Sequence, residues 1–409
     1  MEKDQSERNY GIEWLRILSM LMVVIIHING SGGVIENSSG TNFWLLSNIL
    51  HALCVIAVNL FALISGYLYF NKKIKLKNIF NLWLEVFFYS VGIAIIFYLL
   101  KLETFSWKSF LGYCLPITSG KYWYFTAYFY LFLLMPLLNI VINKTPKKFL
   151  IVITAIILIA FTTYSRINVH FSSVDRLSIE SGFSTVWLAT LYLVGAIIAK
   201  YNIGVKFKNQ EVKPYFYLLF FLFSVGLSLL FGFVVSKING RPLIVVESYN
   251  SIFNAISSIF FFIFFVRKKF KPNKIISFLS KMSFGVYLIH ENRIVRAHCV
   301  LNRFGFVFNY HPFVSLLILI GCAIAIYLAC SIVEFLRQML FKVCRVNKAT
   351  DWADKKLCAF YDKIKIEDSV APNFVKEDNM ENANSEEPIK EESFTKEQGL
   401  ENNDKGENL

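Results

Sequence analysis

Residues 12–27 read IEWLRILSMLMVVIIH, and this apolar run decides the expected fold class and the search for a site. The run carries a cation near its start, Arg16, and an imidazole at its end, His27. The separation of 11 positions corresponds to about three turns of helix and about 16 Å of axial rise. We therefore expect one membrane-spanning helix that presents both side chains on the same face.

Nine more runs resemble the first in length and polarity. Of the 409 residues, 55% are hydrophobic and 17% are charged, whereas ordinary globular chains carry about 25% charge. Runs long enough to cross about 30 Å of hydrocarbon occur near 12–30, 44–70, 79–100, 122–142, 149–165, 183–199, 214–236, 251–266, 276–298 and 312–341. The pattern predicts an all-α, polytopic membrane helix bundle of about ten transmembrane helices.

Basic residues are concentrated in alternate loops, which predicts the topology. Lysines and arginines follow the second, fourth, sixth and eighth runs, whereas the loop 31–43 has neither. Because positive loops stay in the cytoplasm, we expect both termini to be cytoplasmic. The basic excess is explained by topology, and no nucleic-acid-binding motif accompanies it. We therefore expect membrane lipids, and no nucleic acid, as partners.

The chain divides by composition into three parts. Residues 1–345 hold all the apolar runs, residues 346–368 read as a cytoplasmic juxtamembrane segment, and residues 369–409 form an acidic tail. Few apolar residues and many like charges predict that the tail is disordered. The seven cysteines show no C-x-x-C pair, so we expect buried thiols and no metal site.

The first run supplies the strongest site candidates, because ionisable groups in a bilayer are costly. Arg16 suits a phosphate, since its planar donors keep their charge, and His27 suits taking a proton from a hydroxyl near neutral pH. Glu36, nine residues beyond His27, is a candidate to orient that imidazole. In the alternative reading, Arg16 snorkels to the interface and His27 only bonds a neighbouring helix.

Other polar groups in or beside the runs are weaker candidates. His51 is expected near the depth of His27, and Glu85 lacks a partner nearby in the sequence. His290 and Arg293 end the ninth run in a polar cluster that suggests a cavity wall. Tyr122 and Trp123 fit either an interfacial aromatic belt or a surface on which a sugar or adenine stacks.

Several loose motifs occur together in a fixed order. They are IEWLR at 12–16 with His27, VNLFALISGY at 58–67, YWY at 122–124, MPLLN at 135–139 and SFGVYLIH at 283–290. Over residues 10–345 the chain resembles the acyltransferase-3 family of integral membrane O-acyltransferases of the polysaccharide O-acetyltransferase type. Residues 1–345 are then expected to be a transmembrane acyltransferase domain in a bacterial plasma membrane.

The resemblance implies transfer of an acyl group, usually acetyl, from cytoplasmic acetyl-CoA to a sugar hydroxyl. The acceptor would be an envelope polysaccharide or its lipid-linked precursor, and no cofactor would be permanently bound. It also implies that His27 is catalytic and that Arg16 belongs to the same motif. Some relatives carry two arginines after the second span, where Lys72 and Lys73 stand here, so these lysines are expected to help bind the phosphates of coenzyme A.

Two readings of the reaction and one rival function stay open on the sequence alone. His27 either removes the proton from the sugar hydroxyl or accepts the acyl group and passes it on. The rival is a polysaccharide or lipid-linked sugar transporter that uses Arg16, Glu85 and the His290 cluster as a path. A scaffold or sensor is the third possibility, and it would tolerate the loss of Arg16 and His27.

Overall fold

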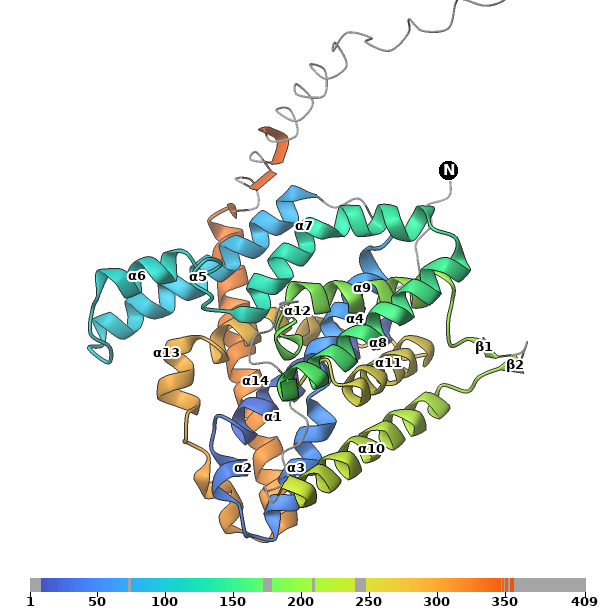
Figure 1. Cartoon of the computed structure of the whole chain (residues 1–409). Coiled ribbons are helices and arrows are strands. Elements are labelled where there is room, and N and C mark those ends of the chain that lie inside the picture. Colours follow the sequence, from blue (N-terminus) through green and yellow to red (C-terminus); the bar gives the residue numbers. More distant parts are fainter. Residues whose placement is uncertain are drawn as a thin grey trace, which may run out of the picture. The chain divides into compact units, whose positions relative to one another are not determined.

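The structure is a computed structural model that describes residues 9–72, 75–171, 179–207, 210–239, 248–346, 348, 350–351 and 354–356. Residues up to Lys355 form one compact unit. The regular secondary structure of the described part is helical, apart from one hairpin of two two-residue strands (Figure 1). This confirms the all-α class. The predicted acidic tail, 369–409, lies outside the described residues, as do Lys73 and most of 346–368.

Seven helical segments are long and apolar enough to cross a membrane, so the prediction of a multi-pass membrane bundle is confirmed. They comprise α1 (Tyr10–Asn29), the pair α3 (Phe43–Cys54) and α4 (Ala57–Tyr69), α5 (Leu76–Leu99), α7 (Trp123–Lys144), α8 (Lys147–Phe171), α10 (Tyr215–Asn239) and α14 (Pro312–Val343). Three shorter helices, α9 (Thr185–Lys200), α11 (Ile252–Arg267) and α12 (Lys274–His290), coincide with the other expected runs. The count of ten spans stays a prediction.

The connections are short elements. They are α2 (Val34–Asn37), α6 (Trp107–Cys114), α13 (Arg293–Val295), the 3₁₀ turns η1 (Glu180–Gly182) and η3 (Gly305–Asn309), and a π-helical turn η2 (Arg296–Val300). The strands β1 (Lys206–Phe207) and β2 (Gln210–Glu211) pair antiparallel, with Lys206 opposite Glu211.

Asparagine side chains fix where the helices that carry the site begin. The Asn9 side chain accepts a hydrogen bond from the Gly11 N–H and starts α1. Asn273 caps α12 in the same way, and Asn292 caps α13. Such caps satisfy N–H groups that a helix start leaves unpaired. Because Asn292 starts a new helix, the ninth expected span ends at His290, which leaves Arg293 and Arg296 beyond α12.

Helix α1 is central, and it packs against α3, α4, α11, α12 and α14 (Figure 1). Helices α4 and α9 pack closely, and their contact depends on two glycines. A Cβ on Gly66 would lie 2.0 Å from the Tyr192 carbonyl oxygen, and one on Gly195 would lie 2.2 Å from that of Leu63. Small residues that let backbones approach closely are typical of helix pairs in membranes.

Hydrogen bonds between helix ends show that the ends rich in Lys and Arg lie on one side of the bundle. Asn9 at the start of α1 donates to the Val266 carbonyl at the end of α11. Lys200 at the end of α9 donates to the Ile142 carbonyl near the end of α7, and Arg267 donates to Ile203 just after α9. We call this side the basic end; α1 leaves it and finishes at Asn29, at the opposite end of the bundle.

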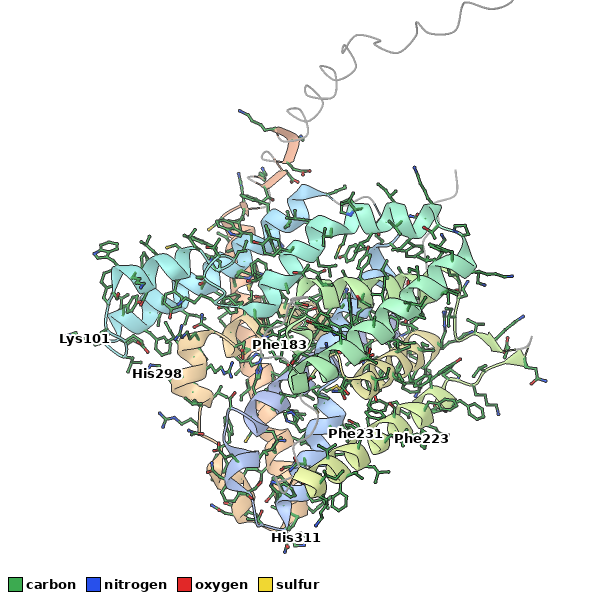
Figure 2. All side chains as sticks on the ribbon, viewed as in Figure 1. Lys101, Phe183, Phe223, Phe231, His298 and His311 are labelled. Carbon is green, nitrogen blue, oxygen red and sulfur yellow. The ribbon has the colours of Figure 1, made fainter. Side chains whose placement is uncertain are left out.

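The outer face of α10 is apolar. Phe223 and Phe231, labelled on α10 in Figure 2, are 65% and 42% exposed. On α14, Ile332 and Leu336 are also exposed. Exposed aromatic and aliphatic faces of this extent fit a hydrocarbon solvent.

Candidate functional site

The site begins where α1 and α12 end side by side. His27 lies in the last turn of α1, and His290 is the last residue of α12. The Nδ1 atom of His27 lies 3.1 Å from Nε2 of His290 and 3.1 Å from Oε2 of Glu291. A single nitrogen of His27 thus contacts the side chains of two consecutive residues, His290 and Glu291, that are distant from it in the sequence.

Backbone contacts determine where the protons of this pair lie. Nδ1 of His290 is 2.6 Å from the Val286 carbonyl oxygen. Because a carbonyl only accepts hydrogen bonds, this Nδ1 carries the hydrogen, and Nε2 of the neutral ring is an acceptor. The neighbouring Nδ1 of His27 is therefore the donor. Its Nε2 keeps a lone pair, which is the form that a base or a nucleophile requires.

Glu291 is a buried carboxylate with a positive partner. Its Oε1 accepts a hydrogen bond of 2.8 Å from Nη1 of Arg296, and Nη2 of Arg296 donates to Ser31 Oγ at 2.7 Å. The arginine offsets the charge of the carboxylate and ties the η2 turn to the loop after α1. The contact between Glu291 and His27 resembles the carboxylate–histidine pair of a hydrolytic triad in its logic.

Glu36 does not occupy the place that the sequence analysis gave it. It lies on α2 with an exposed side chain, and among the described residues the carboxylate in contact with His27 is Glu291. Because the segment after His27 is rich in glycine, the sequence did not determine where Glu36 lies relative to His27. The direct adjacency of Glu291 to His290 is the signal in the sequence that could have pointed to this carboxylate.

A cavity of about 360 Å³ runs between Arg16 and His27. We call it the Arg16 cavity. Its wall is largely apolar and aromatic and includes Val23, Phe61 and Tyr128, and Lys281 adds a second cation. Arg16 and His27 thus line one cavity, as the helical spacing predicted, with a guanidinium toward the basic end and an imidazole toward the opposite end.

The comparison with protein families decides between the classes of function. A family model described as an acyltransferase domain matches residues 9–334. The chain belongs to the acyltransferase-3 family. The matched range includes α1, the Arg16 cavity and the His27–His290–Glu291 cluster, and it identifies a membrane acyltransferase. No curated protein and no solved structure gives a significant match.

Of the two lysines expected to bind phosphate, Lys72 is described in the structure of the acyltransferase, and it does not line the Arg16 cavity. Lys72 lies over the ring of Tyr69, 5.6 Å from its centroid. Lys73 is outside the described residues. The second cation in the wall is Lys281, on α12, which the sequence analysis did not single out as a site residue.

The two aromatic candidates of the acyltransferase differ in position. Tyr122 is 1% exposed; its hydroxyl donates to the Leu288 carbonyl at 3.0 Å and accepts from Asn292 Nδ2 at 2.8 Å. It therefore holds the segment after α12 and offers no free ring face. Trp123 lines the Arg16 cavity, where its ring stacks on Tyr249 with centroids 5.8 Å apart.

His51 and Glu85 lie outside the His27 cluster. His51 is buried on α3, and its Nδ1 has no hydrogen-bond partner among the described residues. Glu85 lies 3.4 Å from Nη2 of Arg337, which also pairs with Glu334. The partner of Glu85 thus comes from α14, and the arrangement is a buried ion cluster between α5 and α14.

A second cavity of about 400 Å³ lies on the other side of Glu291. We call it the Arg293 cavity. Arg293 and Arg296 line it together with Lys121 and Trp123. Arg293, expected from the sequence to bind substrate, is therefore part of a cavity wall next to the catalytic candidate.

The cluster also contains a set of atoms that could hold a metal ion. Ligand atoms of His27, His290 and Glu291 lie within 4.8 Å of one another. Two imidazoles and a carboxylate form a donor set that suits zinc. The 3.1 Å separation between Nδ1 of His27 and Nε2 of His290 is that of a hydrogen bond, whereas Oε2 of Glu291 lies 3.1 Å from the same Nδ1 and has no hydrogen-bond partner among the described residues.

Proposed function

We propose that this acyltransferase moves an acetyl group from acetyl-CoA to a sugar hydroxyl of a cell-surface polysaccharide or its lipid-linked precursor. The observation that carries the proposal is the state of His27. Its Nδ1 is engaged by His290 and Glu291, which leaves Nε2 free at one end of a cavity that has Arg16 at the other. The family match supplies the reaction class.

The donor fits the Arg16 cavity by charge and length. Arg16 and Lys281 are suited to the phosphates of coenzyme A, since arginine binds phosphate through two parallel N–H groups and lysine as a point charge. An extended pantetheine arm then lies along the apolar wall toward His27. The axial rise of about 16 Å between Arg16 and His27 is a distance such an arm spans.

In direct transfer, the sugar oxygen attacks the thioester carbonyl carbon while its proton moves to Nε2 of His27. The carbon–sulfur bond breaks, and the leaving thiolate takes the proton back from Nε2. The products are the O-acetyl sugar and coenzyme A. The imidazolium that forms in between is stabilised by the Glu291 carboxylate at Nδ1, as in a catalytic triad.

In the covalent variant of the reaction, Nε2 of His27 itself attacks the thioester carbon and coenzyme A leaves as the thiol or thiolate. The acyl-imidazole then transfers the acetyl group to the sugar oxygen, whose proton passes to solvent or to the leaving imidazole. Both routes need the same unprotonated Nε2. They differ in whether thioester cleavage requires the acceptor.

The charge distribution supports a plasma-membrane orientation with the basic end in a bacterial cytoplasm. Lys144, Lys147, Lys200, Arg267 and Lys274 all lie at that end of their helices, as the positive-inside rule requires of a cytoplasmic face. Both termini then belong to the cytoplasm, where acyl-CoA is found. His27 lies toward the outer leaflet, with no permanently bound cofactor and no role for nucleic acid.

The test is mass spectrometry of surface glycans from cells with and without the protein. We expect glycans from cells that lack it to lose mass in steps of one acetyl unit, at an unchanged amount of polymer. Unaltered acetylation in every glycan fraction would contradict the proposal. A fall in exported polymer with normal acetylation of what remains would favour a transporter.

A further inference from the structure

The Arg293 cavity is a second chamber at the end of the bundle where α12 finishes. Ser119 and Lys121 before α7 form one wall, and Arg293 and Arg296 after α12 form another. Glu291 lies at its boundary with the His27 cluster. The cavity is therefore adjacent to the groups that hold His27, and apart from Trp123, the first residue of α7, its wall comes from segments outside the long helices.

The charges in this cavity do not balance. Arg296 is paired with Glu291 at 2.8 Å, whereas Lys121 and Arg293 have no ion-pair partner within the part of the chain that the structure describes. Lys121 lies over the Tyr113 ring at 4.0 Å from the centroid. Burial and the nearby Arg293 lower the pKa of Lys121. Two cations that repel each other in one cavity favour an anionic occupant.

The Arg293 cavity also borders the Arg16 cavity. Trp123 lines both of them. Glu291, at the wall of the Arg293 cavity, contacts His27, at the wall of the Arg16 cavity. If the donor fills the Arg16 cavity, the cationic chamber is the space left for the acceptor, which must extend past the shared Trp123 to reach Nε2 of His27.

We propose that the acceptor is an anionic glycan whose carboxylate or phosphate is bound by Lys121 and Arg293. This inference rests on the proposed acetyl transfer and adds the chemical class of the acceptor. A planar guanidinium and an ammonium together match both oxyanions. The flat Trp123 ring next to them offers an apolar surface to the sugar whose hydroxyl reacts.

The experiment begins with glycans from cells that have or lack the protein. Anion-exchange chromatography separates charged from neutral glycans, and solvent extraction first removes lipid-linked material. We expect the missing acetyl groups in a charged fraction. Loss in the lipid-extracted fraction alone would assign the anion to the phosphate of a lipid carrier, and loss in the water-soluble polymer would assign it to the glycan itself.

The second step measures transfer by the purified full-length protein in nanodiscs. The acceptor is the charged fraction from cells that lack the protein, and the donor is acetyl-CoA. For the double variant Lys121→Gln, Arg293→Gln we expect the KM for glycan to rise about tenfold or more, because charge-assisted hydrogen bonds contribute about 1.5–3 kcal/mol, while kcat stays within about twofold. Lys108→Gln, an exposed lysine on α6, is the matched control and should match the parent.

The outcomes separate the two proposals. Acetyl loss confined to neutral glycans, or an unchanged KM in the double variant, would overturn the anionic acceptor and leave acetyl transfer standing. Absence of acetyl loss in every fraction would sink acetyl transfer itself. Calorimetric binding of coenzyme A to the double variant, expected at parental affinity, excludes misfolding as the cause of a raised KM.

Discussion

His27 Nδ1 and His290 Nε2 lie 3.1 Å apart, although the two residues are 263 positions apart in the sequence. The bond exists because α1 and α12 pack together and both end at this level. Nδ1 of His290 donates to the Val286 carbonyl oxygen of its own helix. This hydrogen bond fixes the tautomer of the neutral ring, with Nε2 as the acceptor. The ring of His27 is thereby oriented with its reactive nitrogen away from His290.

Replacing His27 with alanine should remove transfer and spare donor binding. A positioned general base contributes about 10²–10⁴-fold to a rate, so we expect kcat to fall by about that factor. Coenzyme A should still bind, because Arg16 and Lys281 are untouched. The measurement is acetyl transfer by purified protein, with binding followed by calorimetry. Parental kcat in His27→Ala would exclude the proposed chemistry.

Rapid-quench kinetics without acceptor then distinguish the two routes through His27. A burst of coenzyme A equal to the enzyme concentration indicates an acyl-imidazole. Thioester cleavage that strictly requires acceptor indicates direct transfer. The His27→Ala variant should show neither, which provides the baseline.

The carboxylate that supports His27 can be identified by comparing Glu291→Gln with Glu36→Gln. Glu291 lies 3.1 Å from His27, whereas Glu36 is exposed on α2. Removing the charge at Glu291 weakens stabilisation of the imidazolium, so we expect kcat to drop by about 10–100-fold or more with little change in either KM. The Glu36 variant should stay near the parent.

The reverse result, with activity lost in Glu36→Gln and kept in Glu291→Gln, would restore the assignment made from the sequence. Glu211→Gln, an exposed residue of the β hairpin, controls for nonspecific effects of losing a carboxylate.

The sequence predicted the helices well because bilayer thickness sets their length and apolar character. All ten expected runs coincide with helices. The residues at which the helices end were harder to predict, because they depend on capping side chains. The ninth run was extended to residue 298 because apolar residues continue there, whereas α12 ends at His290 and Asn292 caps the next helix. Hydropathy contains no information on such a cap.

The site was predictable only along one helix. Arg16 and His27 share α1, so their common cavity follows from helical geometry. Lys281 lies on α12 and Glu291 directly follows it, and both reach α1 only through packing, which one sequence does not reveal. The partner of Glu85 was missed for the same reason, because Arg337 lies on a helix that is distant in the chain.

Gly195→Ala should destabilise the fold. Its Cβ would lie 2.2 Å from the Leu63 carbonyl oxygen, so α4 and α9 must separate, and such overpacking costs about 1–3 kcal/mol. Gly92→Ala is the matched control, because its Cβ meets nothing within 4 Å. Thermal unfolding in detergent should show a lower midpoint for the first variant only. An unchanged midpoint for Gly195→Ala would contradict the close contact of these helices.

Lys281→Gln should weaken donor binding selectively. Lys281 and Lys274 are both exposed residues of α12, but only Lys281 lines the Arg16 cavity. Loss of one charge-assisted contact to phosphate costs about 1.5–3 kcal/mol, so the KM for acetyl-CoA should rise about tenfold or more. Lys274→Gln should leave it unchanged. If dephosphorylated pantetheine thioesters are used as donors, the difference between parent and Lys281→Gln should vanish, because no phosphate remains for the lysine to bind. A penalty that persists with such donors would mean that Lys281 acts on folding or on the acceptor, and the phosphate assignment would fail.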